Sequence, residues 1–410
     1  MSENPKFHPS RRSFLLASGR LAAAGWVAAA GGWVLKPSWA NAAGPIRVGI
    51  AADISGALST FGNTHWQAAQ FAAKQINDAG GILGRPLELY LEDTVSDPGK
   101  SVGNINRLLS SHELDLVMGG GLSSTREALK VPVIQRAKKL YIYPQHYEGG
   151  DCTPHLYTTA ATVSHQLAFL IPYLIKNKGA KRFALPGANY QWPQMTNALA
   201  RKVIEDNGGE VVFEEYYPLD QVEYSATVGK IMSEKIDHVF NTIIPPGIQG
   251  FMKQLYEAGF AKNGGTQSVL YFDENAVNSV PERALEGVYN ALDFFHTVDD
   301  PYSQQLIKEY NAMFPGSPYL FTAGVSATGS YRGLKFYEQA VLKTNGDLAF
   351  EAITEAYSTA TLEKGPGGGA KMNPDTHAPT MNIYLAQAGG GKWNILDKKE
   401  AVPPGACRAS

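Results

Sequence analysis

The 410-residue sequence has no excess of basic residues, since 36 lysines and arginines stand against 38 aspartates and glutamates. The first 42 positions hold five of the basic residues and one of the acidic residues, which leaves 31 basic and 37 acidic residues in the rest of the chain. Such a chain has no basic stripe that could neutralise a phosphate backbone. The charge balance therefore argues against nucleic acid as a partner.

Long hydrophobic runs are also missing. The longest apolar stretch, Leu21 to Leu35, covers about 15 residues, whereas a helix that spans a bilayer needs roughly 20. It follows a twin-arginine pattern, SRRSFL at 10–15, and precedes a small-residue cleavage site at 40–42. The alternative is a membrane-anchoring helix. We expect residues 1–42 to be a cleaved twin-arginine signal peptide, and the mature chain to be a soluble periplasmic protein without membrane insertion.

Cysteine is scarce, with Cys152 and Cys407 as the two in the sequence. At most one intramolecular disulfide can therefore form, and an oxidising compartment makes it possible. We predict that the two cysteines pair. Two free buried thiols are the alternative that the sequence leaves open.

Catalytic motifs are absent as well. The sequence has neither a G-x-S-x-G elbow nor an H-E-x-x-H zinc motif, and its histidines are scattered. Cys152 lies near His146 and His155, but a structural role is favoured over that of a thiol nucleophile. Asp273 and Glu274 could be acid–base residues or metal ligands, although no second cluster accompanies them, so a polar ligand contact is favoured. From the sequence we therefore expect that the protein is not an enzyme and binds no cofactor.

Short apolar runs alternate with helical patterns from Pro45 onward, which is typical of parallel α/β units. Asp97 followed by Pro98 predicts a helix start, because aspartate caps a helix and proline suits the first helical position. The strands predicted for the first half lie at 46–54, 86–92, 114–118 and 140–143.

The same alternation restarts after about Thr162, so two successive repeats predict two α/β lobes rather than one wide sheet. A terminal hairpin is expected from Met381 to Leu396, turning at Gly389 to Gly391. The other elements predicted are strands at 183–186, 211–213, 238–244 and 269–272, and helices at 193–207, 224–235, 248–259, 302–313, 326–344 and 348–359.

A glycine-rich loop opens a helix in MGGGLSSTREALK, residues 118–130. It matches neither the P-loop nor the G-x-G-x-x-G pattern, which argues against a nucleotide. Ser123, Ser124 and Thr125, with the free N–H groups of the helix start, could instead hold a carboxylate or a polar amide. The alternative is that one of these hydroxyls caps the helix.

Ligands of open α/β sheets bind at the carboxyl ends of the strands. The loops at 119–125, 143–148, 189–192, 245–247 and 273–274 follow predicted strands, so all of them could line one cleft between the lobes. Aromatic residues there predict a pocket wall with polar tips, with ordinary core packing as the alternative. These aromatic residues are Phe61, Tyr143, Tyr147, Tyr190 and Trp192.

The stretch VGIAADISGALSTFGNTHWQAAQFAAKQINDAGGILGRPLELYLEDTVSDPGK, from Val48 to Lys100, resembles the opening of type I periplasmic binding proteins of the leucine/isoleucine/valine-binding family. YPQHYEGGDCTP and KMNPDTHAPTMNIYLAQ resemble its amide- and urea-binding branch more narrowly. The resemblance covers the whole mature chain. It implies two Rossmann-like lobes joined by a three-stranded hinge, with a cleft between them. The lobes implied are 43–162 with 294–364, and 163–293 with 365–410.

The resemblance also implies roles for individual residues. Ser123, with Ser124 and Thr125 beside it, would bind the polar end of the solute, and Gln145 would contact it between Tyr143 and Tyr147. Tyr190 and Trp192 would face it from the second lobe, where Glu274 most nearly matches the acidic residue that binds an ammonium group. Two departures concern the solute: Gly121 stands where an amide sensor has tyrosine, and Gln145 replaces a small hydroxyl residue. Gly121 could make room for a larger solute.

The function implied is that of a monomeric periplasmic receptor that closes over a small polar solute and delivers it to an ABC permease in the inner membrane. Amides, ureas, branched-chain amino acids and small aromatic acids are the candidate solutes. A sensor of the same fold that signals without transport, and a periplasmic enzyme, are the alternatives.

Overall fold

The computed structural model describes residues 44–277, 280–324 and 326–407. The signal peptide predicted at 1–42 lies outside this range. No helix in the described ranges has both the length and the apolar composition that crossing a membrane requires.

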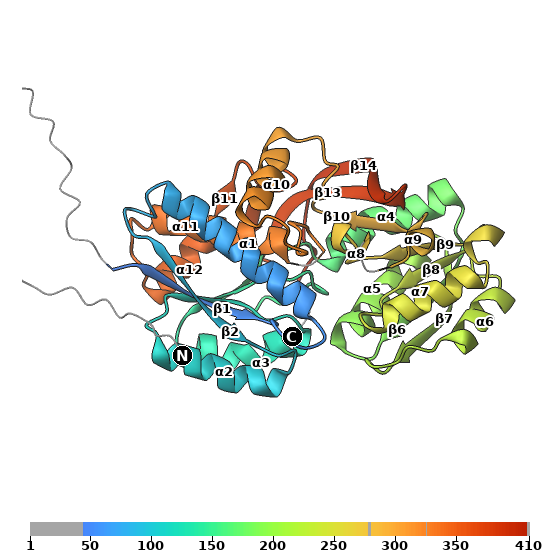
Figure 1. The fold of residues 1–410 in the computed structure, drawn as a ribbon, viewed down its shortest axis with the longest axis horizontal. Coiled ribbons are helices and arrows are strands. Elements are labelled where there is room, and N and C mark those ends of the chain that lie inside the picture. The colour runs from blue at the N-terminus through green and yellow to red at the C-terminus, as the bar shows by residue number, and fades with distance from the viewer. Residues whose placement is uncertain (1–43, 278–279, 325, 408–410) are drawn as a thin grey trace, which may run out of the picture. The chain divides into compact units, whose positions relative to one another are not determined.

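The first sheet holds five parallel strands in the order β2-β1-β3-β4-β5. Nearly every residue of β1 is buried, because helices cover both faces of such a sheet. Figure 1 shows α1 and α11 side by side across one face, with α2 and α3 across the other. The strands are β1 (Ile46–Ala52), β2 (Leu87–Asp93), β3 (Leu116–Gly119), β4 (Leu140–Tyr143) and β5 (Leu156–Thr158).

The helices that accompany this sheet are α1 (Ser59–Asp78), α2 (Pro98–Ser111), α3 (Ser123–Lys130), η1 (Val131–Arg136), α10 (Pro301–Met313), α11 (Ala327–Lys343) and α12 (Phe350–Ser358). The start of α2 was predicted correctly. Asp97 is its N-cap, its side chain accepts the N–H of Lys100, and Pro98 takes the first helical position, where a missing N–H costs nothing.

The second sheet continues parallel strands into antiparallel ones, in the order β11-β12-β13-β10-β9-β8-β6-β7, and β14 pairs with β13. The two sheets are separate, as the two repeats in the sequence predicted. The strands are β6 (Arg182–Ala188), β7 (Glu210–Tyr217), β8 (His238–Asn241), β9 (Thr266–Val269), β10 (Tyr289–Leu292), β11 (Thr361–Leu362), β12 (Ala370–Asn373), β13 (Ala378–Gly389) and β14 (Lys392–Val402).

The helices of this half are α4 (Val163–Lys178), α5 (Gln191–Asp206), α6 (Ser225–Ser233), α7 (Gly247–Glu257), η2 (Ala261–Asn263), α8 (Glu274–Val277) and α9 (Glu282–Leu285). Helix α4 packs against α5, and α6 against α7. The terminal hairpin is present as β13 and β14, which are joined at Gly390 and Gly391 in the left-handed conformation that glycine favours. The strands β5, β10, β11 and β12, of two to four residues each, were not predicted.

Buried Arg332 of α11 joins three connecting segments of the chain. Its guanidinium donates to the carbonyl of Thr159, which links β5 to α4, at 2.7 Å. It also pairs with Asp293, which follows β10, at 2.8 Å, and donates to the carbonyl of Pro366, between α12 and β12, at 3.2 Å. Arg332 and Asp293 side chains are each 1% exposed, so this contact set is withdrawn from solvent. The lobe boundaries given above stay a prediction.

Cys152, in the loop after β4, and Cys407, in the C-terminal tail, form a disulfide with their Cα atoms 5.7 Å apart. The pairing closes a loop across 255 positions of the sequence.

Candidate functional site

A small cavity of about 30 Å³ lies among loops that follow the strands of both sheets. Gly121 and Ser123 follow β3, Tyr143 ends β4, Tyr190 follows β6, and Ile244 follows β8. These are the carboxyl ends of parallel strands, where open α/β folds bind ligands. The cavity is therefore the candidate site.

Two further cavities adjoin it. One of about 110 Å³ shares Phe61 and Tyr271 with the first and reaches Asp273. The other, of about 10 Å³, shares Phe61, Gly121 and Gln145 and reaches Asp53 and His65. A water molecule needs about 10–15 Å³, so the cavity of about 10 Å³ has room for one water molecule at most and is a narrow polar recess.

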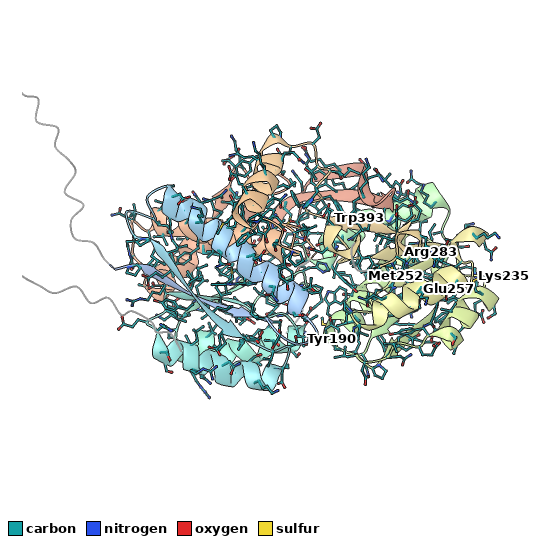
Figure 2. The ribbon with its side chains drawn as sticks, viewed as in Figure 1. Tyr190, Lys235, Met252, Glu257, Arg283 and Trp393 are labelled. Atoms are coloured by element: carbon teal, nitrogen blue, oxygen red, sulfur yellow. A yellow bond between two sulfur atoms is a disulfide. The ribbon has the colours of Figure 1, made fainter. Side chains whose placement is uncertain are left out.

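Aromatic rings form much of the wall. Trp192 lies 6.0 Å from Tyr271 and 6.5 Å from Tyr190, measured between ring centroids, and its ring meets Tyr271 edge to face. Phe61 lies 6.0 Å from Tyr271. These separations fall in the range of favourable aromatic pairs. Tyr190, labelled in Figure 2, is the N-cap of α5 and contributes no capping hydrogen bond, so its ring is free to line the cavity.

Six of the predicted ligand-binding residues line this cavity: Phe61, Ser123, Tyr143, Gln145, Tyr190 and Trp192. The structure brings them together from loops that are far apart in the sequence. Their role in binding stays a prediction.

The other four predicted residues do not line it. Ser124 is exposed, and Thr125 is fully buried beside Gly120. Tyr147 is buried under the guanidinium of Arg126, whose central carbon lies 4.9 Å from its ring centroid. Glu274 accepts the backbone N–H of His296 at 2.6 Å. Its neighbour Asp273 lines the adjoining cavity instead, so the sequence placed the acidic residue one position away from the one that faces this space.

The start of α3 differs from the alternative given above, in which one of the three hydroxyls caps the helix. The N-cap is Leu122, and no side chain accepts a hydrogen bond there. The Ser123 hydroxyl donates instead to Glu148 Oε2 at 3.0 Å. The reason is tertiary: a carboxylate from the loop after β4 accepts the hydrogen bond of this hydroxyl.

Gly121 does not enlarge the cavity. A Cβ atom at this position would lie 2.0 Å from Asp53 Oδ2, so the space next to Gly121 is filled by the Asp53 carboxylate. Asp53 Oδ1 accepts from the Thr94 hydroxyl at 2.9 Å and from the Ser96 N–H at 2.7 Å. Burial raises the pKa of Asp53, and these hydrogen bonds oppose that shift. The expectation that Gly121 makes room for a larger solute is therefore wrong.

A buried ion cluster stands behind Ser123. Arg126 pairs with Glu148 at 2.7 Å and with Asp151 at 3.2 Å, and the side chains of Arg126 and Glu148 are 0% exposed. Burial raises the pKa of Glu148, but the charge and hydrogen bond of Arg126 outweigh it and hold that pKa below its ordinary value. Glu148 also accepts from Gln191 Nε2, at the start of α5, at 2.8 Å. This carboxylate therefore links the two halves of the molecule.

The site includes residues that sequence reasoning missed. Tyr271 and His146 line the cavity, and Asp53 and Glu148 lie directly behind it. Tyr271 was missed because the sequence analysis assigned it to a strand at 269–272. The strand β9 ends at Val269, so Tyr271 lies on the loop that follows it. His146 and Glu148 fall in a loop that was predicted to reach the cleft, but no pattern in a loop tells which side chains turn inward.

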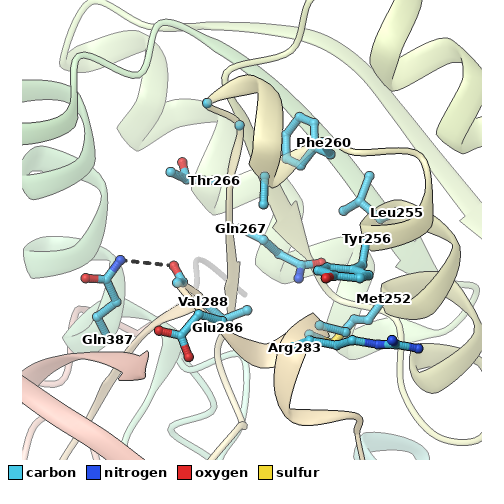
Figure 3. Close-up of a pocket in the computed structure, with 15 residues that line it drawn as sticks. Met252, Leu255, Tyr256, Phe260, Thr266, Gln267, Arg283, Glu286, Val288 and Gln387 are labelled. Carbon is cyan, nitrogen blue, oxygen red and sulfur yellow. Dashed lines mark hydrogen bonds between the residues drawn. The ribbon is translucent and has the colours of Figure 1, made fainter. Parts of the chain in front are cut away.

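A larger cavity of about 230 Å³ lies elsewhere in the second half, between α7 and α9 (Figure 3). Thr266 and Gln267 begin β9, and Gly287 and Val288 precede β10, so this cavity lies at the amino ends of the strands. Gln387 donates to the carbonyl of Gly287 beside it at 3.2 Å. No predicted site residue reaches it, and the strand polarity favours the smaller cavity.

Within the described ranges, no group of three or more histidine, cysteine or acidic side chains is arranged to hold a metal ion.

The chain matches a model of the periplasmic binding protein family over residues 45–392. A leucine-, isoleucine-, valine-, threonine- and alanine-binding protein of Pseudomonas aeruginosa is 21% identical over 335 residues, which cover 80% of this chain and 86% of that protein.

Two solved structures share the fold. The solute-binding protein of an ABC transporter from Rhodopseudomonas palustris, in complex with 3,4-dihydroxybenzoic acid, is 22% identical, with a TM-score of 0.78 over 88% of this chain and 98% of that one. A leucine-binding protein from Thermotoga maritima is 17% identical, with a TM-score of 0.76 over 87% of this chain and 99% of that one.

Proposed function

The chain belongs to the periplasmic binding protein family, whose members bind solutes for ABC transporters and are not enzymes, and from this premise we propose that it is the receptor for a small polar solute, bound in the cavity between its two sheets. Such a receptor closes over its solute and presents the closed form to an inner-membrane permease. Export by the twin-arginine route and a monomeric state are parts of the same proposal.

One observation supports this most. The cavity is lined by loops from both halves of the chain, with Ser123 and Tyr143 on one side and Tyr190 and Trp192 on the other. Glu148 and Gln191 form a hydrogen bond from one half to the other beside it. A solute held among these side chains would favour the closed arrangement by its contacts with both halves.

The finer proposal concerns the solute. The sequence motifs favour an amide or urea, and polar groups such as Gln145 and Ser123 suit it. The aromatic wall favours a second candidate, a small aromatic acid, because rings stack well on Tyr190 and Trp192. An amino acid, as bound by relatives named above, is the third candidate. A sensor of the same fold would bind the same solutes without serving a permease.

Thermal unfolding of the purified mature protein with a panel of amides, ureas, amino acids and small aromatic acids tests the proposal. A solute at 100 times its Kd adds about 2.7 kcal/mol of stability. We expect one class to raise the melting temperature, and Tyr190→Ala to weaken that effect. The matched control is Tyr256→Ala, because Tyr256 is 40% exposed on α7 and lies outside the cavity. A panel without any stabilising member, or equal loss in both variants, would contradict the proposal.

A further inference from the structure

Three of the hydroxyl groups that line the cavity, those of Ser123, Tyr143 and Tyr271, donate hydrogen bonds to other groups of the protein. Ser123 Oγ donates to Glu148 Oε2 at 3.0 Å, and Tyr143 Oη donates to the carbonyl of Gly121 at 2.8 Å. Each hydroxyl has one proton and two lone pairs. Because this proton is already donated within the protein, each of these hydroxyls can only accept a hydrogen bond from a solute. The same holds for Tyr271, which donates to the carbonyl of Ile243 at 2.8 Å.

Glu148 can only accept from Ser123, because it is ionised. Its carboxylate is 0% exposed and is paired with Arg126, so the charged form is the one that the site stabilises. A charged carboxylate has no proton to donate. The direction of the Ser123 hydrogen bond is therefore fixed by Glu148.

Gln166 determines which ring nitrogen of His146 carries the proton. Gln166 Nε2 donates to the carbonyls of Leu270 and Ala291, at 2.7 and 2.6 Å, which uses both of its N–H groups. Gln166 Oε1 must then accept from Nε2 of His146, with which it is in contact. His146 is buried, and burial lowers its pKa to about 4, so the ring is neutral and its Nδ1 carries a lone pair.

One of the donors that line the cavity is buried without an acceptor. Trp192 Nε1 is buried, and in the described part of the chain no group accepts its proton. Trp192 lines the cavity. A buried indole N–H without a partner is costly, and a carbonyl oxygen of the solute would satisfy it. Gln145 lines the same space and can both donate and accept.

We propose that Glu148 is a positioning residue that sets the hydrogen-bond polarity of the cavity, so that the site selects neutral solutes with N–H donors around one carbonyl oxygen and rejects carboxylates. Carboxamides and ureas have this arrangement. A carboxylate lacks the donors for Ser123, Tyr143 and His146, and it adds a negative charge near Glu148 and Asp53. This inference rests on the proposed function, since it concerns the same cavity.

Matched pairs of solutes test it in the wild-type protein. Within each pair, acetamide against acetate and benzamide against benzoate, the two solutes differ in the N–H groups of the polar end and in the negative charge of the carboxylate. We expect isothermal titration calorimetry to give an affinity at least roughly tenfold higher for the amide of each pair that binds, because a carboxylate leaves buried acceptors unpaired. Tighter binding of the carboxylate in either pair would overturn the inference.

Two variants locate the effect. Ser123→Ala should weaken amide binding roughly tenfold to a hundredfold and leave carboxylate binding unchanged. Its matched control, Ser124→Ala, changes an exposed hydroxyl on the next residue and should leave both unchanged. If Ser123→Ala weakens carboxylate binding instead, Ser123 is a donor to the solute and the inference is wrong.

Glu148→Gln should lower the ratio of amide to carboxylate affinity at least roughly tenfold, because a glutamine N–H can donate to Ser123 and free its hydroxyl to donate to the solute. Glu127→Gln is the matched control: Glu127 also pairs with Arg126, at 2.9 Å, but does not contact Ser123. An unchanged ratio in folded Glu148→Gln would overturn the role of Glu148. If this variant does not fold, the Ser123 comparison decides. The proposed function fails separately, when no member of the whole panel binds.

Discussion

Replacing Asp273 by asparagine is expected to stabilise the solute-free protein at pH 8 and to leave its stability at pH 4 nearly unchanged. Asp273 is fully buried, its Oδ2 has no partner in the described part of the chain, and its Oδ1 accepts the N–H of Asn275 at 2.8 Å. Burial, and next the neighbouring Glu274 carboxylate, raise its pKa to about 7.

The sign follows from the direction of this shift. The folded protein holds the Asp273 proton more tightly than the unfolded chain, so the contribution of this group to stability is complete below the unfolded pKa of about 4 and is lost as the pH rises to about 7. The shift from 3.8 to about 7 corresponds to about 4 kcal/mol at about 1.36 kcal/mol per pKa unit. Asparagine keeps the shape and the acceptor for Asn275 but carries no charge. The variant should therefore gain up to about 4 kcal/mol over the wild type at pH 8.

Urea unfolding at several pH values between 4 and 8 measures this difference. The expected result is a difference between variant and wild type that grows with pH. A constant difference, or a variant less stable than the wild type at pH 8, would refute the reasoning. Asp299→Asn is the control, since Asp299 is exposed and its replacement should change stability by less than about 0.5 kcal/mol at every pH.

Four other expectations concern stability, export and closure. Arg332→Met should cost about 3–5 kcal/mol in urea unfolding, because it leaves Asp293 buried and unpaired, and most of the loss should return when Asp293→Leu is added; equal loss in the double variant would contradict this. Cys152→Ser should cost about 5 kcal/mol by the chain-entropy estimate for a separation of 255 positions, and two free thiols in the unreduced wild-type protein would disprove the bond. Arg11→Lys together with Arg12→Lys should leave the precursor in the cytoplasm on immunoblots of cell fractions, unless export uses another route. Gln191→Ala should weaken solute binding several-fold in calorimetry by removing the hydrogen bond to Glu148, and an unchanged affinity would mean that this bond does not favour closure.

Much of the fold could be predicted because its signals are local. Asp97 and Pro98 mark the start of α2 through their own backbone preferences, and the buried run at β1 follows from a strand covered on both faces. Loops after strands could be assigned to one edge for the same reason, since parallel strands bring their carboxyl ends together. Ser123, Tyr143, Tyr190 and Trp192 were found in this way.

The rest of the site depends on contacts between distant positions. Asp53 fills the space beside Gly121, although 68 positions separate them in the sequence, and Glu148, from another loop, accepts the hydrogen bond that Ser123 donates. Ser124 and Thr125 share the chemistry of Ser123, yet one is exposed and the other is buried away from the cavity. A helix turns each residue by about 100°, so only the packing of α3 decides which hydroxyl faces inward.

The sequence by itself therefore determined the α/β architecture with two repeats, the family, and the loops that meet at the cavity, because periodicity, caps and motifs are properties of neighbouring residues. Only the tertiary structure decided that Asp273 rather than Glu274 reaches the adjoining cavity, and that the hydroxyls of Ser123 and Tyr143 donate to Glu148 and to the carbonyl of Gly121. The physical reason is that a hydroxyl donates to whichever acceptor lies beside it. Here each acceptor comes from another part of the chain, so only the folded structure shows where the hydrogen bond goes.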